Sequence, residues 1–287
     1  MGTATPTLNV IGAGRVGCTL AQLWVAQGVF RLQAVLSRSA QAAHALVDAL
    51  SQGQVVTELA AMPAAEVWLL AVPDTQIASV AGALAAVPGL PHGTAWHCSG
   101  FLSAAEMAPL QARGWALAST HPALSFADVA LAQRQFAGTV CALEGDAPAM
   151  AQAQAAYTAI GGRCFTLLAA DKPLYHGAAV FASNFLPVLQ AVAAELWQGT
   201  GVPPEWVHAL ANGFVQRAAA NLQALGPLGA LTGPAARGDV AVVQAQGAAM
   251  AACDPTLAQA YAALSALAVR LAGGGPVIPA RSLPVRS

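Results

Sequence analysis

Residues 8–17 read LNVIGAGRVG, and this stretch decides the fold. An apolar run ends in Gly12, Gly14 and Gly17, which have the spacing G-x-G-x-x-G, and a helical stretch follows them. In a βαβ unit such glycines allow a tight turn, the close approach of a pyrophosphate, and close packing of helix on strand. The free N–H groups at the start of the helix then face the phosphates. The stretch predicts a dinucleotide-binding Rossmann domain, and the alternative is a glycine turn without a ligand. The predicted cofactor-binding residues here are Gly12, Ala13, Gly14, Arg15, Val16 and Gly17.

The end of the next β-rich run, RLQAVLSRS at 31–39, indicates which dinucleotide binds. NAD sites place an Asp or Glu about 20 residues after the glycines, where it binds the ribose hydroxyls. Here that place holds Ser37, Arg38 and Ser39. An arginine between two hydroxyls suits a 2′-phosphate, because it can form charge-assisted hydrogen bonds to it. The sequence therefore favours NADP over NAD, and the alternative is a solvated Arg38.

A third part of the predicted cofactor site is AVPD at 71–74. This tetrapeptide ends the fourth predicted strand at the carboxyl edge of the sheet, where ligands bind in folds of this kind. Ala71, Val72 and Pro73 are therefore predicted to form a wall of the site. An ordinary strand-ending turn is the alternative.

Around these motifs, the first part of the chain alternates β-rich runs with Ala-rich helical stretches, which is the pattern of an open parallel sheet. Strand signals cease near residue 168, and the remainder reads as helices. The predicted fold class is α/β, with an N-terminal Rossmann domain over residues 1–167, an all-α domain over 168–272, and an extended or disordered tail over 273–287. The predicted strands lie within 8–14, 31–39, 54–59, 66–74, 93–100, 114–120, 136–146 and 161–169, and the later helices at 171–198, 204–225, 238–252 and 255–271.

The composition restricts partners and location. The formal net charge is −1 and basic residues do not cluster, so neither a nucleic acid nor an anionic membrane is an expected partner. Charged residues make up 9% of the chain, against about a quarter in typical proteins. So little charge, together with Ala-rich C-terminal helices, predicts a homodimer formed through those helices. The five cysteines lack C-x-x-C spacing, which favours free thiols and a cytoplasmic location.

Neither an export signal nor a membrane span is expected. The first residues, MGTATPTLNV, have no basic region or long apolar run, and Pro6 stands where N-myristoylation needs Ser or Thr. The uncharged run 177–194 approaches the length of a membrane span, but it contains Ser183, Asn184 and Gln190. We expect this run to be a buried helix of a soluble protein.

Polar side chains gather on the first helix after the sheet, which begins DKPLYHGAAVFASN at residue 171. At about 100° per residue, Lys172, His176 and Ser183 fall on one face. A histidine or lysine beside a nicotinamide can supply the proton or positive charge that hydride transfer requires. Lys172, His176 and Asn184 are predicted to be catalytic, and Tyr175 and Ser183 to bind substrate. The alternatives are a solvated lysine, a core histidine, a packing aromatic residue, and polar groups that bond within the helix.

Loops at the carboxyl edge of the sheet add candidates. His97 and Ser99 follow the fifth predicted strand and His121 follows the sixth, and all three are predicted to bind substrate. Arg237 is a further substrate-binding candidate because it could clamp a carboxylate; a turn-fixing pair with Asp239 is the preferred alternative. No two of the histidines near this edge share metal-ligand spacing and no carboxylate accompanies them, so no metal site is predicted.

Seven segments in order resemble one bacterial family: GAGRVG, SRS, AVPD, HCSGFLS, THPALSF, the helix 172–184, and ALTGPAARGD. The family pairs a Rossmann-like domain with a helical C-terminal domain of unknown function, number 2520, and is similar to NADP-dependent pyrroline-5-carboxylate reductase, prephenate dehydrogenase and 6-phosphogluconate dehydrogenase. The resemblance covers nearly the whole chain except the last dozen residues. It implies a helical second domain that often forms a dimer interface, an active site between domains, and catalytic roles for Lys172 and Asn184. Their spacing departs from the K-x-x-x-N of hydroxyacid dehydrogenases.

These features together predict an NADP(H)-dependent oxidoreductase that transfers hydride to or from a small polar carbonyl, imine or hydroxyacid substrate. An NADP-binding sensor or scaffold without chemistry is the alternative. The motifs are specific for fold and nucleotide but not for the reaction, since the shape of a substrate pocket depends on side chains from different elements.

Overall fold

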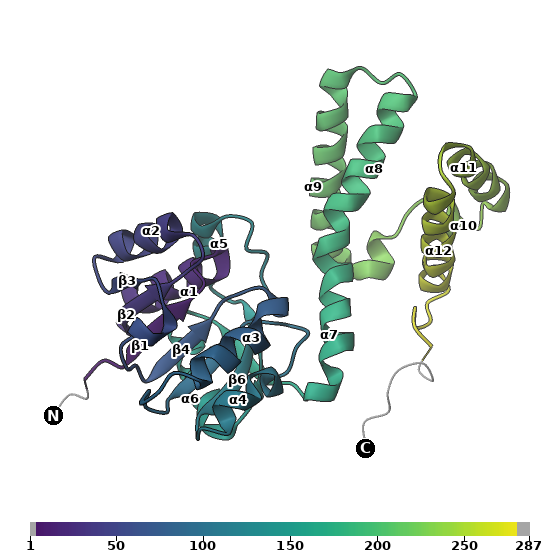
Figure 1. Ribbon diagram of the computed structural model, residues 1–287. Coiled ribbons are helices and arrows are strands. Elements are labelled where there is room, and N and C mark those ends of the chain that lie inside the picture. Colours follow the sequence, from purple (N-terminus) through teal and green to yellow (C-terminus); the bar gives the residue numbers. More distant parts are fainter. Residues whose placement is uncertain (1–3, 280–287) are drawn as a thin grey trace. The chain divides into compact units, whose positions relative to one another are not determined.

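The computed structural model describes residues 4–279, and the chain forms two compact units that meet in sequence between Pro187 and Val188. Figure 1 labels the elements of both units. The N-terminal unit contains a single sheet. Its strands are β1 (Thr7–Ile11), β2 (Arg31–Leu36), β3 (Gln54–Val56), β4 (Val67–Leu70), β5 (Thr94–His97), β6 (Ala116–Pro122), β7 (Val140–Gly145) and β8 (Arg163–Thr166).

The sheet has the order β3-β2-β1-β4-β5-β6-β7-β8, and its pairings are parallel except for that of β6 with β7. Its first six strands follow the order 3-2-1-4-5-6 of the doubly wound dinucleotide-binding fold. A strand overlaps each of the eight predicted ranges, although β1 begins one residue before its range and β6 ends two residues after it; β7 and β8 extend one end of the sheet, as predicted. The prediction of an N-terminal Rossmann-type fold is confirmed.

Helices cover both faces of this sheet (Figure 1). The helices of the unit are α1 (Arg15–Ala26), α2 (Ala40–Leu50), α3 (Asp74–Ala85), α4 (Ala108–Gln111), α5 (Val129–Gln135), α6 (Ala147–Ala159) and α7 (Lys172–Ala179), with 3-10 turns η1 (Leu59–Ala61), η2 (Ala104–Met107) and η3 (Ala169–Asp171) and a π-helical turn η4 (Val180–Asn184).

Because both faces are covered, alternate residues of one strand enter two different cores. In β4, Val67 and Leu69 are buried with residues of α1, α2 and α6, whereas Trp68 and Leu70 are buried with residues of α3 and α4. This explains why the strand reads as a continuous apolar run in the sequence. The two cores fix the carboxyl ends of the parallel strands, from which the functional loops leave.

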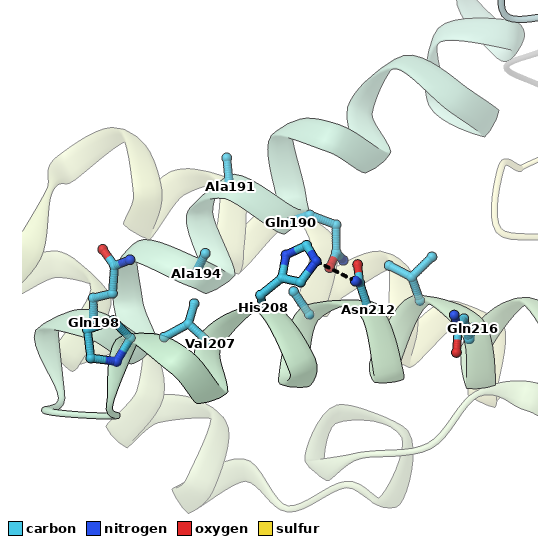
Figure 2. A pocket seen from close by; sticks show the side chains of 11 residues that line it. Gln190, Ala191, Ala194, Gln198, Val207, His208, Asn212 and Gln216 are labelled. Carbon is cyan, nitrogen blue, oxygen red and sulfur yellow. Dashed lines mark hydrogen bonds between the residues drawn. The ribbon is translucent and has the colours of Figure 1, made fainter. Parts of the chain in front are cut away.

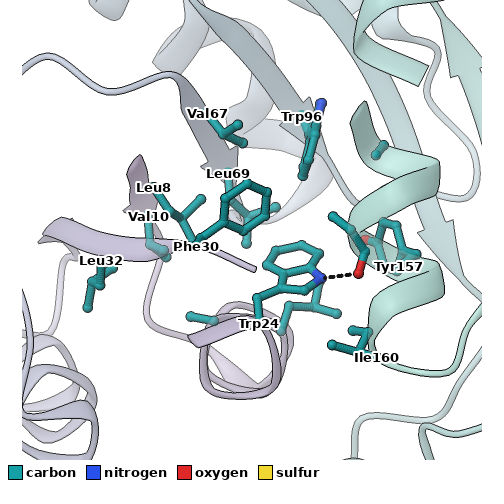
Figure 3. Packing of buried hydrophobic residues seen from close by; sticks show 14 of the residues in the cluster. Leu8, Val10, Trp24, Phe30, Leu32, Val67, Leu69, Trp96, Tyr157 and Ile160 are labelled. Atoms are coloured by element: carbon teal, nitrogen blue, oxygen red, sulfur yellow. Dashed lines mark hydrogen bonds between the residues drawn. The ribbon is translucent and has the colours of Figure 1, made fainter. Parts of the chain in front are cut away.

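Trp24 of α1 lies at the centre of the larger core (Figure 3). Its ring makes edge contacts with Phe30, Trp96 and Tyr157, at centroid distances of 5.6, 5.9 and 5.3 Å. Its indole N–H donates to the carbonyl of Ala156 in α6 over 3.1 Å, so the buried polar atom of Trp24 is satisfied. These contacts tie the first βαβ unit to the last helix that covers the sheet.

The C-terminal unit is helical, as predicted. In α9, Gly226 has φ 68° and ψ 177°, which are not helical, and it precedes Pro227, so the regular helix stops at the predicted residue 225. Residues 273–279 form neither helix nor strand, and the rest of the predicted tail, residues 280–287, lies outside the described residues. The helices are α8 (Phe185–Gly199), which begins before the boundary, α9 (Pro204–Ala230), α10 (Pro234–Arg237), α11 (Val240–Cys253) and α12 (Pro255–Ala272).

The predicted domain boundary at residues 167/168 marks the end of the strands, whereas the compact N-terminal unit continues to Pro187. The difference has a physical cause in Lys172, the first residue of α7. Its side chain is only 1% exposed and is hydrogen-bonded to residues that follow β5 and lie in β6. The first helix after the sheet is therefore packed as a part of the sheet unit.

One helical stretch within the described residues, Ala169–Gly199, is long and apolar enough to cross a membrane by length and composition alone. Its most apolar window has a mean hydropathy of 1.5, and none of that window is buried. The expectation that the run 177–194 is a buried helix is therefore not met within a single chain.

Candidate functional site

A cavity of about 540 Å³ lies at the carboxyl ends of β1, β2 and β4. Its size is within the range of small-molecule and cofactor sites. The cavity brings together three segments that the sequence predicts to bind the dinucleotide, whereas Arg15, Val16 and Gly17 lie outside its lining. Six lining residues were not predicted: Ile11 and Leu36 end strands beside the motifs, and Ala42, Thr57, Gln76 and Val80 lie outside them. The predicted residues in the lining are Gly12, Ala13, Gly14, Ser37, Arg38, Ser39, Ala71, Val72 and Pro73.

The three glycines of the motif are required for different reasons. Gly12 has φ +104°, and a Cβ there would lie 2.3 Å from the carbonyl oxygen of Ala71. A Cβ on Gly17 would lie 2.2 Å from the carbonyl oxygen of Gly12, so both positions need glycine for the fold itself. Around Gly14, by contrast, a Cβ would meet nothing within 4 Å. The open space at Gly14 fits a group that approaches from outside, as a pyrophosphate would.

The helix that follows this turn has uncapped N–H groups. Gly14 is the N-cap of α1 and no side chain caps the helix, whose first turn contains no acid. The N-terminus of α1 can therefore bind an anion. Arg15 lies beside it, but its guanidinium donates to the carbonyl of Ala127 over 3.0 Å.

The residues that are predicted to select the dinucleotide line the same cavity as Gly12 and Gly14. Ser39 is the N-cap of α2 and accepts a hydrogen bond from the N–H of Ala42, so its side chain also has a structural use. Within the described part of the chain, Arg38 makes no hydrogen bond or ion pair, although it lines the cavity. This leaves its guanidinium available for a phosphate. No carboxylate lines the cavity.

A second group of polar residues lies where β5 and β6 end and α7 begins. Lys172 is buried, and its ammonium donates to the hydroxyl of Ser119 over 2.8 Å and to the carbonyl of Ser99 over 3.2 Å. Burial lowers the pKa of Lys172, and the nearby carboxylates of Glu144 and Asp74 oppose that shift. Lys172 is thus an internal donor rather than a solvated lysine.

His121, Tyr175 and His176 are in contact, as expected for residues from a strand end and from the start of the next helix. Nδ1 of His121 lies 3.0 Å from the hydroxyl of Tyr175, and the rings of His121 and His176 are 5.9 Å apart. Burial, followed by the charges of His176 and Lys172, lowers the pKa of His121 to about 4, so this imidazole is neutral near pH 7. Such a group accepts or relays a proton and does not act as a fixed cation.

Gly100 forms the floor beneath this cluster. A Cβ on Gly100 would lie 2.6 Å from Cδ2 of His176 and 2.8 Å from the ring of His121. Both imidazoles thus rest against the backbone that follows Ser99. A small displacement of this backbone would therefore shift both imidazole rings.

His97 is a core histidine. It is fully buried, Nε2 lies 2.9 Å from the carbonyl of Ser103, and Nδ1 accepts from the N–H of Ser99 over 3.2 Å. These partners assign the ring proton to Nε2. Burial lowers the pKa of His97 to about 4. Both ring nitrogens are occupied by the backbone, which leaves neither for the predicted contact with a substrate.

Ser99 is likewise surrounded by protein groups. Its hydroxyl donates to Oδ2 of Asp74 over 2.7 Å and accepts from the N–H groups of Phe101 and Leu102, over 3.2 and 2.9 Å. The sequence predicted a substrate contact for Ser99 and no role for Asp74. The signal was present in AVPD, where the acid directly follows the residues that line the cofactor cavity.

Ser183, Asn184 and Arg237 bond locally. The hydroxyl of Ser183 lies 3.0 Å from the carbonyl oxygen of Ala179 and 2.9 Å from Oδ1 of Asn184, so its single proton has acceptors within the same helical segment. The predicted stripe assumed a regular α-helix, but the π-helical turn η4 has more residues per turn and changes the phase after residue 179. Arg237 pairs with Asp239 at 2.9 Å, which is the turn-fixing alternative.

A second cavity, of about 630 Å³, lies in the C-terminal unit between α8 and α9 (Figure 2). Small and amide side chains line it, and His208 is hydrogen-bonded to Asn212 over 2.9 Å. Oε1 of Gln190 is buried, and no residue among those that the structure describes is its hydrogen-bond partner. Over the described ranges of both units, residues 4–279, no group of three His, Cys, Asp or Glu side chains is arranged to hold a metal ion.

Similarity to known proteins agrees with this geometry. Residues 7–92 match the family described as NADP oxidoreductase, coenzyme F420-dependent, and residues 139–268 match the domain of unknown function DUF2520. No curated protein matches the chain.

Solved structures extend the likeness over both units. A protein from Thermotoga maritima is 26% identical with a TM-score of 0.72, over 93% of this chain and 98% of that chain. A protein from Bacteroides fragilis, provisionally named an NADP oxidoreductase, is 24% identical with a TM-score of 0.75, over 93% and 99%. A 1-pyrroline-5-carboxylate reductase from Streptococcus pyogenes is 14% identical with a TM-score of 0.60, again over 93% and 99%. The last two likenesses show the fold alone. Over residues 7–92 the chain is therefore similar to the NADP oxidoreductase, coenzyme F420-dependent, family, and over residues 139–268 it is similar to DUF2520, the two parts that its motifs resemble.

Proposed function

We propose that this protein is an NADP(H)-dependent oxidoreductase that transfers hydride to or from a small polar carbonyl, imine or hydroxyacid. The observation that carries the proposal is the cavity at the sheet edge, which the glycine turn and Arg38 line together. The uncapped start of α1 suits the pyrophosphate, and the unpaired guanidinium suits a 2′-phosphate. A bound nicotinamide would supply the hydride.

The histidine cluster supplies the other half of the chemistry. Hydride arrival on a C=O or C=N carbon leaves charge on the heteroatom, which takes up a proton. We assign this proton transfer to His176, with Tyr175 as the second candidate because its hydroxyl is hydrogen-bonded to His121. Lys172 donates to two serine oxygens, and its positive charge lies behind the cluster. Asn184 stays a candidate for substrate binding or catalysis.

The fold of the neighbours supports the substrate class. Proteins named as 1-pyrroline-5-carboxylate reductase and arogenate dehydrogenase share the fold. The first name denotes a cyclic imine as substrate, and the second denotes an amino acid. A small polar substrate of one of these kinds is therefore our proposal for this chain. We also propose a homodimer formed through the C-terminal helices, because the apolar window of Ala169–Gly199 is unburied in one chain.

Steady-state oxidation of NADPH against a panel of 2-ketoacids and cyclic imines tests the activity, and calorimetry of NADP⁺ tests binding separately. We expect binding and turnover on at least one substrate of the panel. Binding without turnover on a broad panel would support a sensor instead. The absence of NADP⁺ binding would overturn the proposal.

A further inference from the structure

Ser99 connects the two halves of the candidate site through its carbonyl group. This carbonyl accepts hydrogen bonds from the hydroxyl of Ser119, over 3.0 Å, and from the ammonium of Lys172, over 3.2 Å. Ser99 is 6% exposed, and the next residue is Gly100, on which the imidazoles of His121 and His176 rest. The position of the Ser99 backbone therefore determines the position of the floor of the histidine cluster.

The hydroxyl of Ser99 connects the same backbone to the cofactor cavity. The hydroxyl of Ser99 donates to the carboxylate of Asp74 over 2.7 Å, which is a short, charge-assisted hydrogen bond. Asp74 is the first residue of α3; the residue before it, Pro73, and the residue two positions after it, Gln76, line the cavity. The hydroxyl also accepts from two N–H groups, so it fixes the turn from 99 to 102 as one piece.

We propose that Asp74 is a positioning residue that couples occupancy of the dinucleotide cavity to the turn 99–102, and through it to His121 and His176. The inference rests on the proposed function in one respect, that the cavity binds a dinucleotide. Asp74 does not itself contact the reacting atoms. A ligand that holds Ala71–Pro73 and the start of α3 in place also holds the carboxylate of Asp74 in place. Through its hydrogen bond, this carboxylate then restricts the position of Ser99. Coupling between two sites of this kind typically amounts to about 5-fold or more in an equilibrium constant.

NMR-detected amide exchange of Phe101 and Leu102, with and without saturating NADP⁺, measures this coupling without a substrate. In the wild-type protein we expect NADP⁺ to slow exchange of both amides by about 5-fold or more. In Asp74→Ala we expect NADP⁺ still to bind but this ratio to fall to about 1, because the coupling is absent. A purely structural role of Asp74 would speed exchange equally with and without NADP⁺, and would leave the ratio unchanged. Asp74→Asn keeps an acceptor oxygen and should retain part of the effect.

Asp254→Ala is the matched control. Asp254 is also a carboxylate at a helix start, where it accepts from the N–H of Leu257 over 2.9 Å in the C-terminal unit. This variant should retain the wild-type ratio. If Asp74→Ala does not fold, Ser99→Ala removes the same hydrogen bond from the other side, and the imidazole signals of His121 and His176 then replace the amides as readout. These signals should shift with NADP⁺ in the wild type but not in the variant.

Two results would overturn the coupling: saturation of the wild type with NADP⁺ without slower exchange at Phe101 and Leu102, or equal slowing in Asp74→Ala. Failure of the wild type to bind NADP⁺ is a different result, because it removes the proposed function itself.

Discussion

The ammonium of Lys172 donates a 2.8 Å hydrogen bond to the hydroxyl of Ser119, which lies 53 residues earlier in the chain. This bond connects the start of α7 to β6, and it brings His176 over the carboxyl edge of the sheet. A positive charge that is 1% exposed is retained in proteins when hydrogen bonds compensate its burial. Lys172 has such bonds, because its ammonium donates to the hydroxyl of Ser119 and to the carbonyl of Ser99.

Replacement of His176 or Lys172 should affect catalysis more than cofactor binding. We expect His176→Ala and Lys172→Met each to lower kcat by about 100-fold, because proton transfer and the nearby positive charge are lost, while NADPH affinity changes little. The methionine keeps the volume of the buried side chain. Steady-state kinetics and calorimetry measure the two effects. His44→Ala, an exposed site on α2, is the control and should keep wild-type turnover. Full turnover in both variants would show that the cluster is structural.

The cofactor preference should follow Arg38. We expect NADPH to bind about 10-fold or more tightly than NADH, which corresponds to about 1.4 kcal/mol, and Arg38→Asp to reverse much of this preference. Arg31→Asp makes the same charge change at the other end of β2, outside the cavity lining, and should leave the preference intact. Equal affinities of the wild type for the two nucleotides, measured by calorimetry, would contradict the assignment.

Substitutions of Gly12 and Gly14 should have different effects, the first on stability and the second on NADP⁺ affinity. Gly12→Ala places a Cβ 2.3 Å from the carbonyl oxygen of Ala71 at a φ of +104°, so we expect it to destabilise the N-terminal unit by about 2 kcal/mol or more. Gly14→Ala meets no protein atom within 4 Å, so its stability should be near that of the wild type while NADP⁺ affinity falls. Thermal denaturation and calorimetry measure the two effects. Tight NADP⁺ binding by Gly14→Ala would show that no phosphate approaches there.

The burial of His97 should make stability depend on pH. Its pKa is lowered from 6.5 to about 4 in the folded protein, so between these values the unfolded chain binds more protons. Stability therefore rises with pH across this window, and acidification from about pH 6.5 to 4 should remove up to about 3 kcal/mol through this group. His97→Gln keeps one donor and one acceptor but does not titrate, so its unfolding free energy should depend less on pH. His44→Gln should follow the wild type, and identical pH profiles for all three proteins would contradict the argument.

Assembly should depend on the C-terminal helices. Light scattering at micromolar concentration should give the mass of a dimer, with an interface of about 2,000 Å² or more. Leu225 of α9 is 61% exposed, and Leu225→Glu should weaken the dimer if that surface is covered by the partner. Leu131→Glu places the same charge on a 38% exposed leucine of α5 and should not. A monomeric mass for the wild type would refute the proposal.

The sequence predicts the sheet and the cofactor cavity well because both are local. Apolar runs and glycine turns specify each strand, and the parallel sheet then brings all carboxyl ends to one edge. The partners of Lys172 could not be predicted in this way, since Ser99 and Ser119 lie on other elements and only the packing of α7 brings them together. The π-helical turn at Val180–Asn184 was not predictable from a 100° periodicity, and it changes the helical phase of the residues after Ala179.

The tryptophans of the two units differ in their exposure to water, which affects the intrinsic fluorescence of the protein. Trp24, Trp68, Trp96 and Trp115 are buried in the N-terminal unit, whereas Trp206 in the C-terminal unit is 61% exposed. Indoles shielded from water emit at shorter wavelength than hydrated ones, so unfolding of the Rossmann unit should dominate any red shift of the intrinsic fluorescence. A Trp206→Phe variant would remove the most hydrated of these indoles and leave Trp197, which is half-buried and stacked on Phe214, as the remaining tryptophan of the C-terminal unit. The wavelength of the emission maximum then follows the unfolding of the N-terminal unit, and no added label is needed.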